Sequence, residues 1–129
     1  MQEAYTTTAS IIYSKDILRI VVKKDSVITL ADVENHFRVF ARLTGNKKTL
    51  VLVDARESFT ISAEARAYSA KHSPEQRIAT AIITNSPTGR KIVNLYLTIN
   101  KPSVPTRMFG NEEEALEWLK EYKWTKKNI

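Results

Sequence analysis

The chain has 129 residues, no cysteine and a formal net charge of +6, from 20 lysines and arginines against 14 aspartates and glutamates. This length fits one domain over residues 1–129 that buries most of its unfolded surface without help from a disulfide or a metal. The missing cysteines exclude disulfide bonds and thiol chemistry. We therefore expect a self-sufficient fold in a reducing compartment, the cytoplasm.

The positive charge could attract nucleic acid, but its distribution argues against that partner. Basic pairs such as Lys23-Lys24, Lys47-Lys48 and Arg90-Lys91 are scattered along the chain and form no stripe with aromatic residues. The amino terminus is polar and carries Glu3, and no apolar run approaches the ~20 residues of a membrane helix. We predict a protein that neither binds nucleic acid nor inserts into a membrane.

The amino-terminal third predicts a hairpin followed by a helix. Two β-branched runs, 10–13 and 17–22, flank a polar break that has the length of a hairpin turn. Thr29 then begins a helix as its N-cap, with Asp32 placed to complete a capping box and Gly45 placed to end the helix. An antiparallel hairpin and a capped helix are therefore expected here.

Two continuous apolar runs predict the interior of the sheet. Residues 50–53, closed by Asp54, and residues 77–84 lack the alternation of a half-exposed strand, which is typical of strands covered on both faces in α/β sheets. Between them, a helix that begins near Ser62 runs through alanine-rich sequence to His72. The two strands are thus expected to be joined by a helical crossover.

The remaining chain predicts two helices around a short strand. Ser86-Pro87 carries the residues favoured at a helix start, and we expect this helix to reach Asn100, although the apolar residues of 93–99 alternate as in a strand. After a strand at 106–109, Asn111 caps a last helix whose first turn holds three glutamates. The chain therefore closes on a strand and a helix.

The order of these elements, ββαβαβαβα, defines the expected fold class. Helices that alternate with strands are typical of parallel pairing, because each crossover returns the chain to the same end of the sheet. We predict an α/β fold with a single mixed, mostly parallel sheet of four or five strands, about four helices and an N-terminal antiparallel hairpin.

Three segments resemble the bacterial SpoIIAA-like family, also labelled STAS or STAS/SEC14-like. They are the strand at 50–54, residues 91–102, and the closing strand and helix from Pro105 to Leu119. The resemblance implies a soluble bacterial module that is not an enzyme and acts through protein contacts in binding or regulation. Its SEC14-like branch suggests an alternative, a carrier of a small ligand or a lipid.

The same resemblance draws attention to Ser62. Antagonists of anti-sigma factors in this family carry Asp-Ser-Ser-Gly at the start of the helix after the central strand, and a kinase partner phosphorylates one of the serines. The matching stretch here is Ile61-Ser62-Ala63-Glu64. Ser62 is therefore either a phosphorylation site, as the resemblance implies, or a plain helix N-cap, as the loss of the flanking aspartate, second serine and glycine favours.

Polar residues after the two interior strands suggest a small pocket. If those strands are parallel neighbours, Asp54, Arg56, Asn85 and Ser86 emerge at one edge of the sheet, where α/β proteins place their sites. Arg90 adds a cation near the free N–H groups of a helix start, which attract anions. In the alternative, Asp54 and Arg56 pair with each other or cap nearby helices. No nucleophile signature or phosphate loop accompanies them, so we expect no catalytic residue, metal or cofactor.

The helix predicted at 87–100 carries more apolar surface than one sheet can cover. Its apolar residues spread over about 200° of a helical wheel, against the ~100° stripe that faces a core. We expect the surplus to form a homodimer or partner interface with Val93, Tyr96 and Leu97, in which Tyr96 is the anchor. An interior cavity above roughly 300 Å³ would instead favour the carrier.

Overall fold

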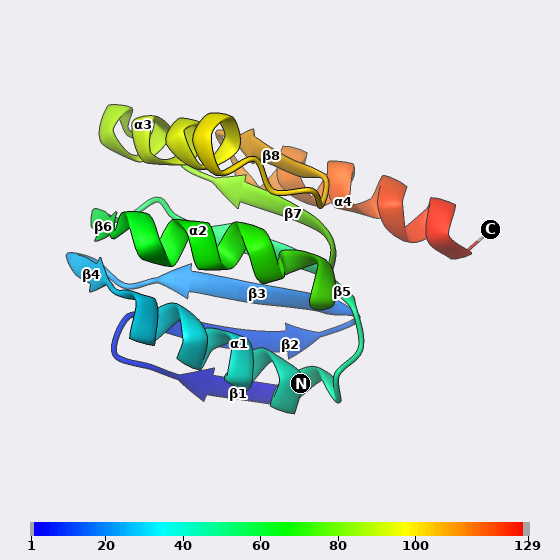
Figure 1. Ribbon diagram of the computed structural model, residues 1–129. Helices are drawn as coiled ribbons and strands as arrows, with labels where there is room; N and C mark the ends of the chain where they lie inside the picture. Colours follow the sequence, from blue (N-terminus) through cyan, green and yellow to red (C-terminus); the bar gives the residue numbers. More distant parts are fainter. Residues whose placement is uncertain (1, 128–129) are drawn as a thin grey trace.

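The computed structural model describes residues 2–127 and is built on a six-stranded sheet (Figure 1). Its strands are Gln2–Tyr5 (β1), Ala9–Ser14 (β2), Ile17–Val22 (β3), Thr49–Asp54 (β5), Arg77–Ile83 (β7) and Thr106–Phe109 (β8). They lie in the order β1-β2-β3-β5-β7-β8. The first three pair antiparallel and the others pair parallel. Ser26–Ile28 (β4) and Phe59–Ile61 (β6) form a separate parallel pair.

Helices cover both faces of the sheet, but unequally. Their bounds are Leu30–Thr44 (α1), Ala63–His72 (α2), Pro87–Leu95 (α3) and Glu112–Lys127 (α4). The first three lie on one face, whereas α4 lies on the other, against β5, β7 and β8 (Figure 1). None of the helices described over residues 2–127 is long and apolar enough to cross a membrane. Because α4 contacts β5, β7 and β8, the same side of β1 and β2 has no covering helix among residues 2–127.

The helix boundaries follow from the capping residues that the sequence predicts. The Thr29 hydroxyl accepts a hydrogen bond from the Asp32 N–H, and the Asp32 carboxylate accepts one from the Thr29 N–H, which completes the capping box. Gly45 ends α1 at a φ of 64°, a left-handed conformation that glycine adopts at little cost. At the start of α4, the Asn111 side chain accepts a hydrogen bond from the Glu114 N–H. These predicted caps are confirmed.

The predicted hairpin is confirmed, but the sheet is larger than expected. Lys15 and Asp16 both have positive φ, at 54° and 65°, as a two-residue turn between twisted strands requires. The prediction of four or five strands is wrong, because β1 adds a sixth strand at the edge of the sheet. Its sequence is polar, and pairing with β2 makes it a strand. The strands β4 and β6 have three residues each, too few to show a period.

The apolar segment at 93–99 is helical, as predicted, but its last turn widens. After α3, residues Tyr96–Asn100 form a π-helical turn in which the Lys101 N–H donates to the Tyr96 carbonyl, five residues earlier. Lys101 has a φ of 48° and ends the helix. In this turn Tyr96 is 9% exposed, whereas Ile99 is 70% exposed. The predicted helix therefore reaches Asn100 with its aromatic residue turned inward.

The two faces of the sheet bury separate cores. Toward α1 and α2, Leu18 and Phe40 are buried in one cluster, and toward α4, Leu52 and Leu119 are buried in another. Burial of a side chain such as Phe40 stabilises a fold by about 1.5 to 3 kcal/mol. A third cluster, around Val93, lies under α3 on the same face as the first. The candidate site lies where the first and third clusters meet.

Candidate functional site

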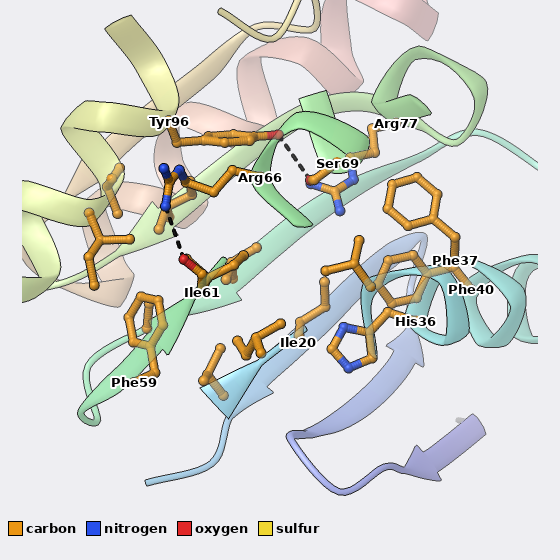
Figure 2. Close-up of a pocket in the computed structure, with 18 residues that line it drawn as sticks. Ile20, His36, Phe37, Phe40, Phe59, Ile61, Arg66, Ser69, Arg77 and Tyr96 are labelled. Atoms are coloured by element: carbon orange, nitrogen blue, oxygen red, sulfur yellow. Dashed lines mark hydrogen bonds between the residues drawn. The ribbon is translucent and has the colours of Figure 1, made fainter. Parts of the chain in front are cut away.

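A cavity of about 130 Å³ lies between the sheet and helices α1, α2 and α3 (Figure 2). Its wall is apolar except for His36, Arg66, Ser69, Arg77 and Tyr96. None of the lining residues is an aspartate or a glutamate. The cavity therefore combines an apolar wall with two guanidinium groups that have no acid beside them.

Arg77 is the most unusual residue of this wall. It begins β7, its side chain is 8% exposed, and no acidic residue pairs with it among residues 2–127. Its Nη1 makes one long hydrogen bond, of 3.4 Å, to the Thr80 hydroxyl, and its Nε has no partner. The rings of Phe37 and Phe40 lie 5.5 and 5.8 Å from the guanidinium carbon. Burial lowers the pKa of Arg77, yet a guanidinium stays charged near neutral pH.

Arg66 brings a second guanidinium to the cavity from α2. Its Nη1 donates a 3.0 Å hydrogen bond to the Ile61 carbonyl in β6, and its buried Nε has no partner (Figure 2). One turn further along α2, the Ser69 hydroxyl lies 3.0 Å from the Tyr96 hydroxyl and shares a hydrogen bond with it. The polar part of the wall thus comes from α1, α2, β7 and the π-helical turn.

His36 completes the polar wall without adding charge. It lies buried on α1, and its Nε2 is 3.0 Å from the Thr8 hydroxyl and 3.3 Å from the Thr6 hydroxyl. Burial lowers the pKa of His36, and the nearby charge of Arg77 lowers it further, against the opposing effect of Asp32. The imidazole is therefore neutral near pH 7. The arginines alone set the sign of the potential in the cavity.

The predicted polar residues at the sheet edge are placed as expected but do not form one cluster. Asp54 and Arg56 pair with each other, since Arg56 Nε and Nη2 donate to the two carboxylate oxygens at 2.9 and 2.7 Å. This bond holds the pKa of Asp54 below its usual value. Asn85, Ser86 and Arg90 follow the neighbouring parallel strand, but no hydrogen bond or ion pair within residues 2–127 joins them to that pair. An anion pocket at this edge stays a prediction.

Ser62 acts as the N-cap of α2. It is in an extended conformation, and its hydroxyl accepts a 3.1 Å hydrogen bond from the Ala65 N–H. Ser62 is exposed at the surface. The N-cap interpretation is confirmed, and phosphorylation of this residue stays a prediction.

We expect Ser62→Ala to lower the free energy of unfolding by about 0.5 to 2 kcal/mol, because the Ala65 N–H loses its acceptor. Ser62→Asp keeps an acceptor at the same place and should be nearly neutral. Urea denaturation of the three proteins measures both effects. A strongly destabilised Ser62→Asp variant would contradict the capping role.

The residues predicted to form an interface on the third helix face mainly inward. Val93 and Tyr96 are buried within the chain's own fold, and Leu97 is half-buried. Tyr96 lines the cavity, so the expectation that it stands at the surface as an anchor is corrected. The exposed apolar residues of this segment are instead Leu95 and Ile99. An apolar contact made by this helix would therefore centre on those two side chains.

One face of β1 and β2 carries no helix among the described residues, and β3 lies at the border of the area that α4 covers (Figure 1). Tyr5 lies there with 69% of its surface exposed. Arg19 is on the same face and pairs with Glu112 at the start of α4, which marks the border of the uncovered area. We call this surface the open face. It comprises Tyr5, Ser10 and Val21, which are in register, and Ile12, which is in register with Glu3 and Arg19.

Sequence reasoning misses the two arginines of the cavity. Arg66 stands in an alanine-rich helix and Arg77 stands at the start of an apolar run, and surface arginines are common at both kinds of position. A weak signal does exist, because Arg77 is the only charged residue in the run 77–84. A strand covered on both faces tends to bury the residues at its ends as well. A charged residue there is worth noting, because burial of a charge is costly unless the charge is paired.

The sheet order and the helices on both faces form an α/β fold of the SpoIIAA-like class. The structure is similar to the crystal structure of an uncharacterized protein from the DUF3478 family with a SpoIIAA-like fold, from Shewanella loihica PV-4, with a TM-score of 0.59 and 21% identity, covering 86% of this chain and 91% of that chain. Residues 11–123 match the model of a domain of unknown function, DUF7793, and the chain belongs to that family. No curated protein matches it. The resemblance to SpoIIAA-like proteins is thus confirmed for the fold.

Proposed function

We propose that this chain is a non-enzymatic binding or regulatory module that acts through protein contacts on its open face, and that its partner is a second copy of itself. The observation that carries the proposal is the sheet surface around Tyr5, where no helix of the described part of the chain covers the half-buried Ile12 and Val21. Apolar residues gathered on one surface mark contact sites. A two-fold pair would cover the same face of both copies.

The arrangement of titratable groups supports a module without catalysis. A nucleophilic side chain is activated by an adjacent general base, which a third group orients. His36 lies within hydrogen-bond distance of Thr6 and Thr8, but no carboxylate within residues 2–127 forms a hydrogen bond to its ring. The other histidine, His72, interacts with Glu75 at the surface.

The cavity is too small for a lipid carrier. Its volume of about 130 Å³ lies below the ~300 to 1,000 Å³ of typical ligand pockets. A lipid chain would need the helices to separate from the sheet. Cavity size therefore favours the module over a carrier of long-chain lipids.

Sedimentation equilibrium at high micromolar concentration tests the proposal. We expect wild type to have the mass of a dimer and Val21→Lys to weaken the dimer by about tenfold or more, because the new charge would be buried against the partner. The matched control is Val27→Lys on β4, which replaces a valine that is 68% exposed and outside the open face. It should associate as wild type does.

Two results would contradict this function. A wild type that stays monomeric at the highest concentration excludes the second copy as partner. Equal weakening by Val21→Lys and Val27→Lys would place the contact elsewhere. Circular dichroism of each variant separates lost association from lost folding.

A further inference from the structure

The cavity holds a positive charge that the fold leaves uncompensated. Arg77 is more than nine-tenths buried, and its guanidinium makes one long hydrogen bond within the described chain. A buried ion without a counter-ion destabilises a protein, and such ions are normally paired. The two phenylalanine rings beside it stabilise a cation through their faces, but they do not accept its N–H groups in the way that an oxygen does.

A second cation faces the same space. Arg66 also has a buried Nε without a partner, and its single hydrogen bond goes to a backbone carbonyl. No lining residue is acidic, and the pKa of His36 is lowered by burial, so no group of the wall balances the two charges. The unpartnered N–H groups of the two arginines can donate hydrogen bonds to the oxygens of a carboxylate.

The rest of the wall limits the size and polarity of what can enter. Side chains such as Ile20, Ile82 and Val93 surround the space between the arginines and the sheet. A protein cavity of about 150 Å³ lined by apolar residues holds one benzene ring. The volume of about 130 Å³ therefore matches a single ring or a short branched chain.

We propose that this cavity binds a compact apolar carboxylate, with its carboxylate on the guanidinium of Arg77 and its apolar body against the sheet and α3. Arg66 supplies the second cation. The lining residues Phe59, Ile61 and Ile92 are partly exposed, so solvent reaches the cavity wall on β6 and α3. This site is separate from the open face, so it stands or falls independently of the proposed protein contact.

Benzoate is a suitable probe because it joins one ring to one carboxylate. Isothermal titration calorimetry near neutral pH should show one benzoate bound per chain. Benzamide has the same shape without the charge. We expect its affinity to be lower than that of benzoate by about tenfold or more. Amide chemical shifts in NMR should move at Arg77, Ile82 and Val93 and should leave the open face unchanged.

Substitutions assign the binding to the arginine. We expect Arg77→Met to reduce benzoate affinity by about tenfold or more, and Arg66→Met to reduce it less. The matched control is Arg107→Met, which removes an exposed arginine that also lies over a phenylalanine ring, at 5.3 Å from Phe109. It should bind benzoate as wild type does.

Several outcomes would overturn this site. Equal affinity for benzoate and benzamide would show that charge is not recognised, and absence of benzoate binding would show that the cavity is closed to a compact acid. Tighter binding of laurate than of benzoate would indicate a lipid chain instead. Tighter binding of inorganic phosphate than of benzoate would show that the apolar wall does not contribute to ligand recognition. If Arg77→Met does not fold, the affinities of wild type for benzoate and benzamide and the benzoate affinity of Arg66→Met still test the site.

Discussion

The Arg77→Met variant should be more stable than wild type, by about 1 to 4 kcal/mol in the free energy of unfolding. Methionine is unbranched and apolar, shorter than arginine by the end of the guanidinium, and it removes a buried charge that has no acidic partner among the described residues. The contacts with Phe37 and Phe40 are lost as cation–π interactions but are retained as apolar packing. Urea denaturation followed by circular dichroism measures the difference.

Arg107→Met serves as the control for this prediction. Arg107 is exposed and lies over Phe109, so its replacement removes a comparable cation–π contact without removing a buried charge. Its stability should stay near that of wild type. A loss of stability in Arg77→Met larger than in Arg107→Met would contradict this prediction. It would mean that the buried guanidinium of Arg77 stabilises the fold.

Stability and binding are then expected to change in opposite directions at one residue. A site that holds an unpaired cation ready for an anion costs the empty protein stability, and such trade-offs are usual at binding sites. A more stable Arg77→Met variant that no longer binds benzoate is the combination that the geometry predicts. A merely structural arginine would not produce this pairing of effects.

Gly89→Ala should destabilise the protein by about 1 to 3 kcal/mol, which is the usual cost of forcing a methyl group into a packed interior. A Cβ at this position would lie 2.2 Å from the Thr84 hydroxyl oxygen and 2.9 Å from the Ser86 hydroxyl oxygen. Thr84 is buried at the end of β7, so it has little room to move. Gly89 therefore lets the first turn of α3 approach the sheet closely.

A matched glycine and a second substitution test this interpretation. Gly110→Ala should be nearly neutral, because nothing lies within 4 Å of a Cβ there. Thr84→Ala removes the oxygen that the new methyl group meets, and in the Gly89→Ala background it should recover part of the lost stability. Thermal denaturation of the two single variants, Thr84→Ala and Gly89→Ala, and of the double variant gives a double-mutant cycle. Additive effects of Thr84→Ala and Gly89→Ala would show that the two residues do not clash.

The parts of the fold predicted from sequence are those that local chemistry determines. Thr29 and Asp32 form their capping box between neighbours three residues apart, and Gly45 ends the helix through its own backbone. The runs at 50–53 and 78–83 are interior strands, because burial on both faces favours apolar residues at nearly every position. No distant contact is needed to recognise these elements.

The missed elements depend on contacts between segments that are distant in sequence. The strand β1 has one buried residue, Ala4, and becomes a strand through its pairing with β2. The strands β4 and β6 pair with each other across more than thirty residues. Short polar segments of this kind carry no periodic signal, so their pairing appears only in three dimensions.

The candidate site was beyond sequence reasoning for a similar reason. Arg77 and Arg66 lie on different elements, and whether an acid pairs with either of them depends on how α2 packs over β7. Tyr96 is expected in an interface because the apolar residues of this helix spread over about 200° of a helical wheel. In the structure Tyr96 follows Val93 by three residues on the buried side of the helix, and its ring lines the cavity.

The two margins of the sheet determine how copies of this protein can associate. The strand β1 is four residues long and carries the exposed Glu3, and β8 is equally short, follows Pro105 and carries the exposed Arg107. Short edge strands with charges and a flanking proline resist pairing with another chain. Backbone-to-backbone extension into a fibre is therefore disfavoured at both margins. Copies that meet through the uncovered sheet surface form a closed pair, which cannot grow further by the same contact.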